Sequence, residues 1–107
     1  MASFDLEICG IARSHQLRES WATHTVSLID RKYSGAFPTG DPAVHLVHRF
    51  DDVEADMGEL KAPVRADLEK ILAFTANLQD GDRLLVHCHA GVSRSTSAAI
   101  AILIQHG

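Results

Sequence analysis

The chain has 107 residues, and 10 Lys and Arg against 14 Asp and Glu give it a formal net charge of −4. Since domains typically hold about 100–150 residues, the sequence predicts a single domain over residues 1–107. An apolar fraction of 46% and a charged fraction of 22% exclude intrinsic disorder, and the acidic balance argues against nucleic acid as a partner.

The first half of the chain predicts three strands and one short helix. Apolar and polar residues alternate over 4–9, which is typical of a strand, and the mixed, polar segment 11–21 favours a short helix. β-Branched residues over 23–29 predict a second strand. Glycines and prolines over 30–42 predict a loop, and 43–50 predicts a third strand.

The second half begins with an acidic loop over 51–62. Pro63 opens a helix that we expect to run to Leu78, because proline is tolerated in the first helical turn. The apolar run 84–86 predicts a strand buried on both faces. The segment 96–104 is apolar nearly all round, which is typical of a buried helix.

Strands that alternate with helices predict an α/β fold with a central, mostly parallel sheet flanked by helices. Ligands of such sheets bind at the carboxyl ends of the strands. The loop from Cys88 to Arg94 lies at that edge, between a predicted strand and a predicted helix.

This loop has the chemistry of an anion site. The N-terminus of the following helix adds about half a positive charge, and Arg94 adds a guanidinium suited to two phosphate oxygens. Gly91 allows the loop to turn closely. The same positive field favours the thiolate of Cys88, which is placed for attack on phosphorus, and Ser95 can hydrogen-bond to that sulfur. An inert, buried cysteine beside an arginine that pairs with a local carboxylate is the alternative.

The segment from His87 to Ser95 resembles the signature loop of the cysteine-dependent protein tyrosine phosphatases, which is His-Cys, five residues, Arg, and Ser or Thr. The residues of this segment are most similar to those of the dual-specificity branch and of small bacterial predicted tyrosine phosphatases. The resemblance implies a phosphotyrosine-phosphatase-like fold and a metal-independent protein-tyrosine or dual-specificity phosphatase without cofactors. It also implies a cysteinyl-phosphate intermediate and phosphorylated proteins as substrates, phosphotyrosine first. The implied phosphate-binding residues are His89, Ala90, Gly91, Val92, Ser93 and Arg94.

The family also uses a general acid from a loop before the signature. Carrying its pattern of Phe, an acid and the catalytic Asp onto this chain selects Asp52. Asp51 and Asp56 remain alternatives, and Asp56 fits the usual spacing to the cysteine better. The implied catalytic residues are therefore Cys88, Arg94, Asp52 and Ser95.

No metal site is expected, although the chain has seven histidines. His45 and His48 would face opposite sides of a strand, and the loop that holds His87 and His89 is already explained by anion binding. Structural zinc usually takes four ligands with clear spacing, which this sequence lacks.

The remaining expectations concern compartment and assembly. Cys9 and Cys88 are too few for a disulfide framework, the N-terminus has no basic segment, and the apolar run 98–104 is too short to span a bilayer. We therefore expect a cytoplasmic protein with no membrane partner. The family usually continues with covering helices after this point, so we expect a domain incomplete at its C-terminus, with a homo-oligomer as one way to cover the last helix.

Two other functions stay open. One is a phosphate-binding pseudophosphatase that acts as an interaction module. The other is the same chemistry on a non-protein phosphoester, although the loop lacks the Lys that inositide-acting relatives often carry.

Overall fold

The computed structural model describes residues 3–37, 39–49, 65–89 and 93–107, and the account below concerns these residues. Strands and helices follow one another along the chain in the order β1 (Asp5–Cys9), α1 (Ile11–Ser20), β2 (His24–Ile29), β3 (His45–Arg49), α2 (Arg65–Thr75), β4 (Arg83–His87) and α3 (Ser93–His106).

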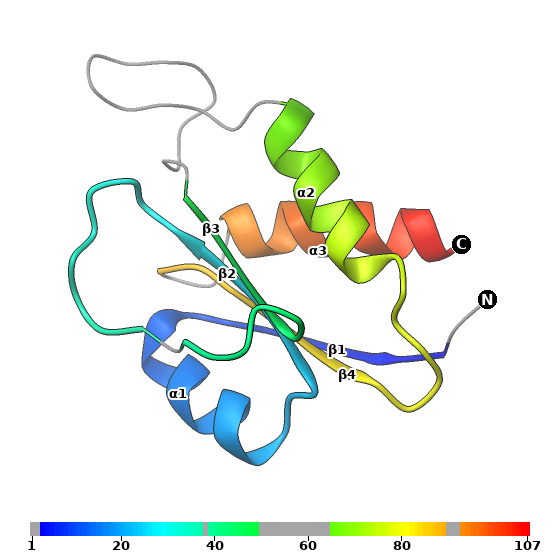
Figure 1. Ribbon diagram of the computed structural model, residues 1–107, viewed down its shortest axis with the longest axis horizontal. Coiled ribbons are helices and arrows are strands. Elements are labelled where there is room, and N and C mark those ends of the chain that lie inside the picture. The colour runs from blue at the N-terminus through cyan, green and yellow to red at the C-terminus, as the bar shows by residue number, and fades with distance from the viewer. Residues whose placement is uncertain (1–2, 38, 50–64, 90–92) are drawn as a thin grey trace.

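The described strands form one four-stranded sheet in the order β1-β4-β2-β3, and every pair of neighbours is parallel. Figure 1 shows α1 on one face of this sheet and α2 and α3 on the other. The predicted α/β fold with a parallel sheet flanked by helices is therefore confirmed. Because the strands are parallel, their carboxyl ends meet at one edge of the sheet, where β4 leads toward α3.

The sheet face beneath α2 and α3 carries the apolar core. Successive residues of a strand point to opposite faces, so Leu84 and Val86 of β4 lie on this face together with Val26 and Leu28 of β2. All four are fully buried, and so is Leu85 on the opposite face, which confirms that the apolar run of β4 is buried on both sides. The helices complete the core with Ile71, Leu78, Ala98 and Ile102.

The opposite face, beneath α1, carries several buried polar side chains. Ser27 of β2 is the register partner of His87 on β4, and His45 of β3 is the partner of Thr25. These positions alternate with the apolar core positions, so the four side chains share the α1 face. All four are buried. Buried polar groups require hydrogen-bond partners, and these residues therefore matter for the site described below.

The C-terminal end of α2 differs from the prediction. The helix ends at Thr75, whereas its apolar pattern predicted an end at Leu78, and Pro63 lies outside the described residues. The Thr75 hydroxyl donates to the Ile71 carbonyl at 2.9 Å. The Leu78 N–H then bonds to the Thr75 carbonyl at 3.3 Å, which closes a tight turn that still delivers Leu78 to the core. Apolar periodicity could not distinguish that turn from one more helical turn.

One face of α3 is buried in this chain and the other is exposed, as expected for a last helix that still needs a cover. Ala98, Ala99 and Ile102 are buried against the sheet, whereas Ile100 and Ile104 are 54% and 74% exposed. The predicted helix itself is confirmed: it runs over Ser93–His106, beyond the predicted 96–104 at both ends. Within the described ranges, no helix has the length and apolarity needed to cross a bilayer.

The two isoleucines of α3 provide a matched test of the core. We expect Ile102→Ala to lower the free energy of unfolding by about 2–5 kcal/mol, because it removes a fully buried side chain from between helix and sheet. Ile104→Ala removes an exposed side chain and should change that free energy by no more than about 0.5 kcal/mol. Urea unfolding of both variants measures the difference, and equal losses would contradict this packing.

Candidate active site

Cys88 follows the last residue of β4 and its side chain is buried, with 2% of the residue exposed. Its Sγ lies 3.4 Å from the Oγ of Ser95, which is fully buried in the first turn of α3. The sulfur therefore lies at the carboxyl edge of the sheet and near the N-terminus of a long helix. Unbonded N–H groups and the helix dipole make such a terminus favourable for negative charge.

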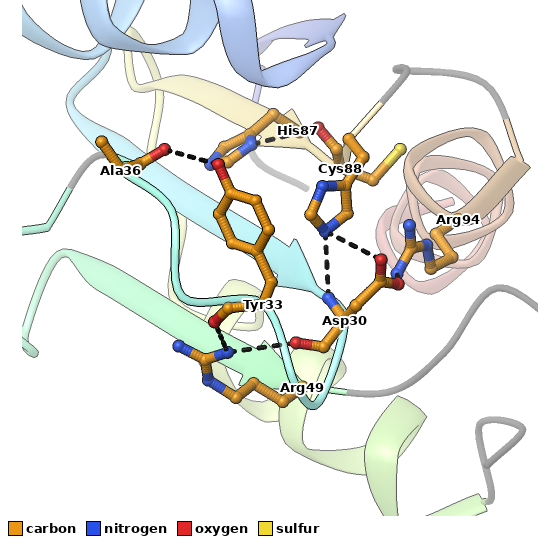
Figure 2. A network of polar contacts seen from close by, with 8 residues as sticks. Asp30, Tyr33, Ala36, Arg49, His87, Cys88 and Arg94 are labelled. Carbon is orange, nitrogen blue, oxygen red and sulfur yellow. Dashed lines mark hydrogen bonds and ion pairs between the residues drawn. The ribbon is translucent and has the colours of Figure 1, made fainter. Parts of the chain in front are cut away.

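Arg94 brings a full positive charge to the same place. Its side chain is 7% exposed, and its Nη1 donates to Oδ1 of Asp30 at 2.5 Å. Asp30 follows the last residue of β2, the strand next to β4, so the two loops meet because their strands are neighbours. A buried guanidinium without a counter-charge would be strongly destabilising, so Asp30 fixes both the charge and the place of Arg94. Figure 2 shows the pair beside Cys88.

The backbone around Asp30 is itself held from two sides (Figure 2). Nη1 of Arg49, at the end of β3, donates to the carbonyls of Asp30 and Tyr33 at 3.0 and 2.9 Å. From the other side, Nε2 of His89 accepts the Asp30 N–H at 3.1 Å. Three strand ends are thus connected at the edge where the site lies.

The same Nε2 of His89 lies 3.3 Å from Oδ2 of Asp30, which would be an ion pair if that nitrogen carried a proton. One nitrogen cannot both accept the backbone N–H and donate to the carboxylate. The backbone N–H has a fixed direction and points at this nitrogen, so we assign Nε2 as the acceptor of the Asp30 N–H.

The remaining contacts of His89 turn it toward the segment after β2. Its ring packs edge-to-face with the ring of Tyr33, with centroids 4.6 Å apart, and its carbonyl accepts the Ile11 N–H of α1 at 3.1 Å. Its side chain is thus engaged with Asp30 and Tyr33, so its part in anion binding would come through the backbone.

A chain of hydrogen bonds between buried side chains leads to the backbone carbonyl of Cys88. Nε2 of His87 is 2.6 Å from Oγ of Ser27, and the same oxygen is 2.8 Å from Nε2 of His45. Nδ1 of His87 lies 3.4 Å from the Cys88 carbonyl oxygen. Burial lowers the pKa of His87 to about 4, and burial together with the nearby Arg18 lowers the pKa of His45. Both imidazoles are therefore neutral at physiological pH.

Three of the predicted catalytic residues, Cys88, Arg94 and Ser95, lie at this edge of the sheet. Asp52 lies outside the described residues, as do its alternatives Asp51 and Asp56. Among the predicted phosphate-binding residues, Ala90, Gly91 and Val92 also lie outside them, and Ser93 begins α3.

Sequence reasoning missed Asp30, Ser27 and His45. Each is distant in sequence from the loop that it contacts, and only the strand order brings it there. The sequence does hold one signal for Asp30: it directly follows a predicted strand, and acids at that position lie at the carboxyl edge of a parallel sheet, where ligands bind.

Cys9 is the other cysteine and is also buried. It is the register partner of His87 and lies on the α1 face, whereas Cys88 packs with the core on the other face. Burial raises the pKa of the Cys9 thiol, which keeps it protonated. Cys9 therefore has the character of a small buried apolar residue.

The arrangement combines a thiol, a fixed cation and helix N–H groups at one point. Such a site suits a tetrahedral dianion bound by Arg94 and attacked by the Cys88 sulfur. No group of three or more His, Cys, Asp or Glu side chains arranged to hold a metal ion occurs among the residues that the structure describes.

Comparisons of the chain with protein-family models, with curated proteins and with solved structures found no match.

His87 makes stability depend on pH. Its pKa is about 4 in the folded chain, against 6.5 for an ordinary histidine, so the unfolded chain binds more protons between these values. We therefore expect the free energy of unfolding to fall as pH is lowered from about 7 to about 4, by roughly 3 kcal/mol from this group. Urea unfolding across that range measures the slope.

The control is His87→Gln, which should flatten this pH dependence although it lowers stability at every pH. An unchanged slope in His87→Gln would show that His87 is protonated without cost in the folded chain.

Proposed function

We propose that the protein is a cysteine-dependent phosphomonoester hydrolase, a protein-tyrosine or dual-specificity phosphatase. The observation that supports it is the placement of the Cys88 thiol between the end of β4 and the start of α3, 3.4 Å from the Ser95 hydroxyl and beside the buried Arg94. The ion pair between Arg94 and Asp30 also fits the alternative of an inert, buried cysteine. The hydroxyl of Ser95 at the sulfur is the contact that favours a reactive thiol over that alternative. The resemblance of residues 87–95 to the phosphatase signature supports the same reading.

In the first step, the Cys88 thiolate attacks phosphorus, a sulfur–phosphorus bond forms and the bond to the leaving oxygen breaks. Arg94 binds two non-bridging oxygens, and the charge that develops on them is stabilised by the guanidinium and by the amides at the start of α3. Because Asp30 already fixes the guanidinium, little reorganisation is needed when the phosphate binds.

The leaving oxygen needs a proton, since a tyrosine oxygen has a pKa near 10 and a serine alkoxide is a worse leaving group. Asp52 is our choice for this acid, from the sequence pattern that precedes the signature loop. In the second step, the deprotonated carboxylate accepts a proton from water, which attacks phosphorus and breaks the sulfur–phosphorus bond. The Ser95 hydroxyl donates to the departing sulfur at that point.

The reaction as written needs no metal ion and no cofactor. Phosphotyrosine in proteins is the substrate class that we place first, followed by phosphoserine and phosphothreonine. A non-protein phosphoester would undergo the same steps at the same residues.

Replacement of the nucleophile tests this function directly. We expect the wild type to hydrolyse 4-nitrophenyl phosphate without added metal, and Cys88→Ser to lose more than about a thousandfold in kcat, because serine is a far weaker nucleophile here. The control is Cys9→Ala, which changes the thiol on the other sheet face and should keep most of the activity. A folded wild type without turnover that still binds inorganic phosphate would instead make the chain a binding module.

The general acid is tested by a pair of variants. We expect Asp52→Asn to lower kcat for an aryl phosphate by about a hundredfold and Asp56→Asn to change it little, because only the acid that touches the leaving oxygen contributes to this step. The activity of the wild type should be highest at mildly acidic pH, where Cys88 is ionised and the acid is protonated. A larger loss in Asp56→Asn would transfer the role to Asp56, and a rate rising steadily into alkaline pH would contradict acid catalysis.

A further inference from the structure

We propose that Ser27 and His45 are positioning residues for Cys88, and that their hydrogen bonds hold His87 in the tautomer with its proton on Nδ1. In that tautomer His87 donates to the carbonyl of Cys88. This inference deepens the proposed function and rests on it for its catalytic meaning, whereas the tautomers themselves are properties of the folded chain.

The three side chains meet because of the strand register. Ser27 lies opposite His87 on the neighbouring strand, and His45 lies on the same sheet face of the strand beyond. Ser27 and His87 are fully buried, and His45 is 6% exposed. Water therefore does not compete for these hydrogen bonds, and each proton must be shared among the side chains themselves.

The Ser27 hydroxyl decides in which direction the hydrogen bonds are donated, because it has one proton and accepts with its lone pairs. In the first direction, Ser27 donates to Nε2 of His87 and accepts from Nε2 of His45. Nδ1 of His87 then carries a proton and donates to the Cys88 carbonyl, 3.4 Å away. The one atom left over is Nδ1 of His45, which is buried and has no hydrogen-bond partner among the described residues. In this direction it carries a lone pair.

The opposite direction produces two defects. His87 would donate from Nε2 to Ser27, so its Nδ1 lone pair would face the lone pairs of the Cys88 carbonyl. Ser27 would donate to His45, whose Nδ1 would then hold a buried N–H without an acceptor in the described part of the chain. A buried N–H without an acceptor is more costly than an unused lone pair, and the acceptor–acceptor contact adds to that cost. The first direction is therefore favoured.

The surroundings of His45 favour the same direction. Gly40 lies between the two groups: a side chain on it would collide with Nη2 of Arg18, and its Cβ would lie 3.5 Å from Nδ1 of His45. The Arg18 guanidinium is therefore close to the Nδ1 edge of the His45 ring. A positive charge there opposes a proton on Nδ1 of His45. The Nε2 proton, which the first direction requires, is the one that remains.

The consequence for Cys88 lies in its backbone. The donated hydrogen bond holds the Cys88 carbonyl at the point where β4 ends, and the Sγ extends from that residue toward Ser95. Without Ser27, Nε2 of His87 loses its donor, and of this chain only the 3.4 Å contact with the Cys88 carbonyl still holds the ring. The ring can then shift, the carbonyl loses its fixed donor, and the sulfur is held less firmly relative to Ser95 and Arg94. Ser27 and His45 thus act on the nucleophile through His87.

The first test is the tautomeric state, which does not depend on any activity. Nitrogen-15 NMR of the histidine rings in the full chain distinguishes a proton on Nδ1 from one on Nε2. We expect His87 to carry its proton on Nδ1 and His45 on Nε2 at neutral pH, with assignment by His87→Gln and His45→Gln. A wild-type His87 with its proton on Nε2 overturns the proposal.

The second test is the reactivity of Cys88, measured as alkylation by iodoacetamide with mass spectrometry to separate Cys88 from Cys9. We expect His45→Phe, which removes the donor to Ser27, and Ser27→Ala to slow alkylation of Cys88 by about threefold to tenfold, the effect of one net hydrogen bond. His45→Gln keeps an N–H donor and should restore most of the rate. In the hydrolysis assay the same losses should fall on kcat, with KM unchanged.

The outcomes separate the two proposals. Correct tautomers and slowed alkylation without phosphate hydrolysis would reject the phosphatase and keep the hydrogen-bonded chain. Hydrolysis in a protein whose His87 has its proton on Nε2 would keep the phosphatase and reject the hydrogen-bonded chain. If Ser27→Ala fails to fold, the test rests on the wild-type tautomers and on the alkylation rates of the two His45 variants. Equal rates in folded His45→Phe and His45→Gln would overturn the positioning role.

Discussion

Strand β4 hydrogen-bonds to β1 on one side and to β2 on the other, and both neighbours run in its direction. This pairing places the end of β4, the end of β2 and the start of α3 at one edge of the sheet (Figure 1). The ion pair between Arg94 and Asp30 and the contact between Cys88 and Ser95 both lie there. An antiparallel β2 would bring its other end to this edge, and the buried Arg94 would then lose its ion pair with Asp30.

The two faces of β4 carry different kinds of side chain, apolar on one face and partly polar on the other. On one face, Leu84 and Val86 pack beneath α2 and α3 and supply apolar burial, which stabilises the fold. On the other face, His87 belongs to a buried polar chain with Ser27 and His45. Such a chain adds little net stability and is tolerated because nearly every hydrogen-bonding atom has a partner. In our proposal its value is directional, since it fixes the donor to one backbone carbonyl, that of Cys88.

The elements of the fold were largely predictable because their signals are local. Alternation marked β1, an apolar run marked β4 and helical spacing marked α2. The prediction was wrong where two structures share one pattern: Leu78 has the spacing of a helical residue, yet a turn at Thr75 carries it to the same core. For α3, the apolar composition predicted the helix but not which of its faces the sheet covers; Leu103 is apolar and 52% exposed.

The sequence by itself determined which residues of the signature loop gather, because Cys88, Arg94 and Ser95 are close along one short connection between a strand and a helix. Only the tertiary structure decided what surrounds them. Asp30 and Arg94 are 64 positions apart, and Ser27 and His87 are 60 apart. Their meeting depends on β2 lying next to β4, and strand order follows from packing of the whole sheet. Local propensity does not encode it, so the residues that surround Cys88 and Arg94 come together only when the chain is folded.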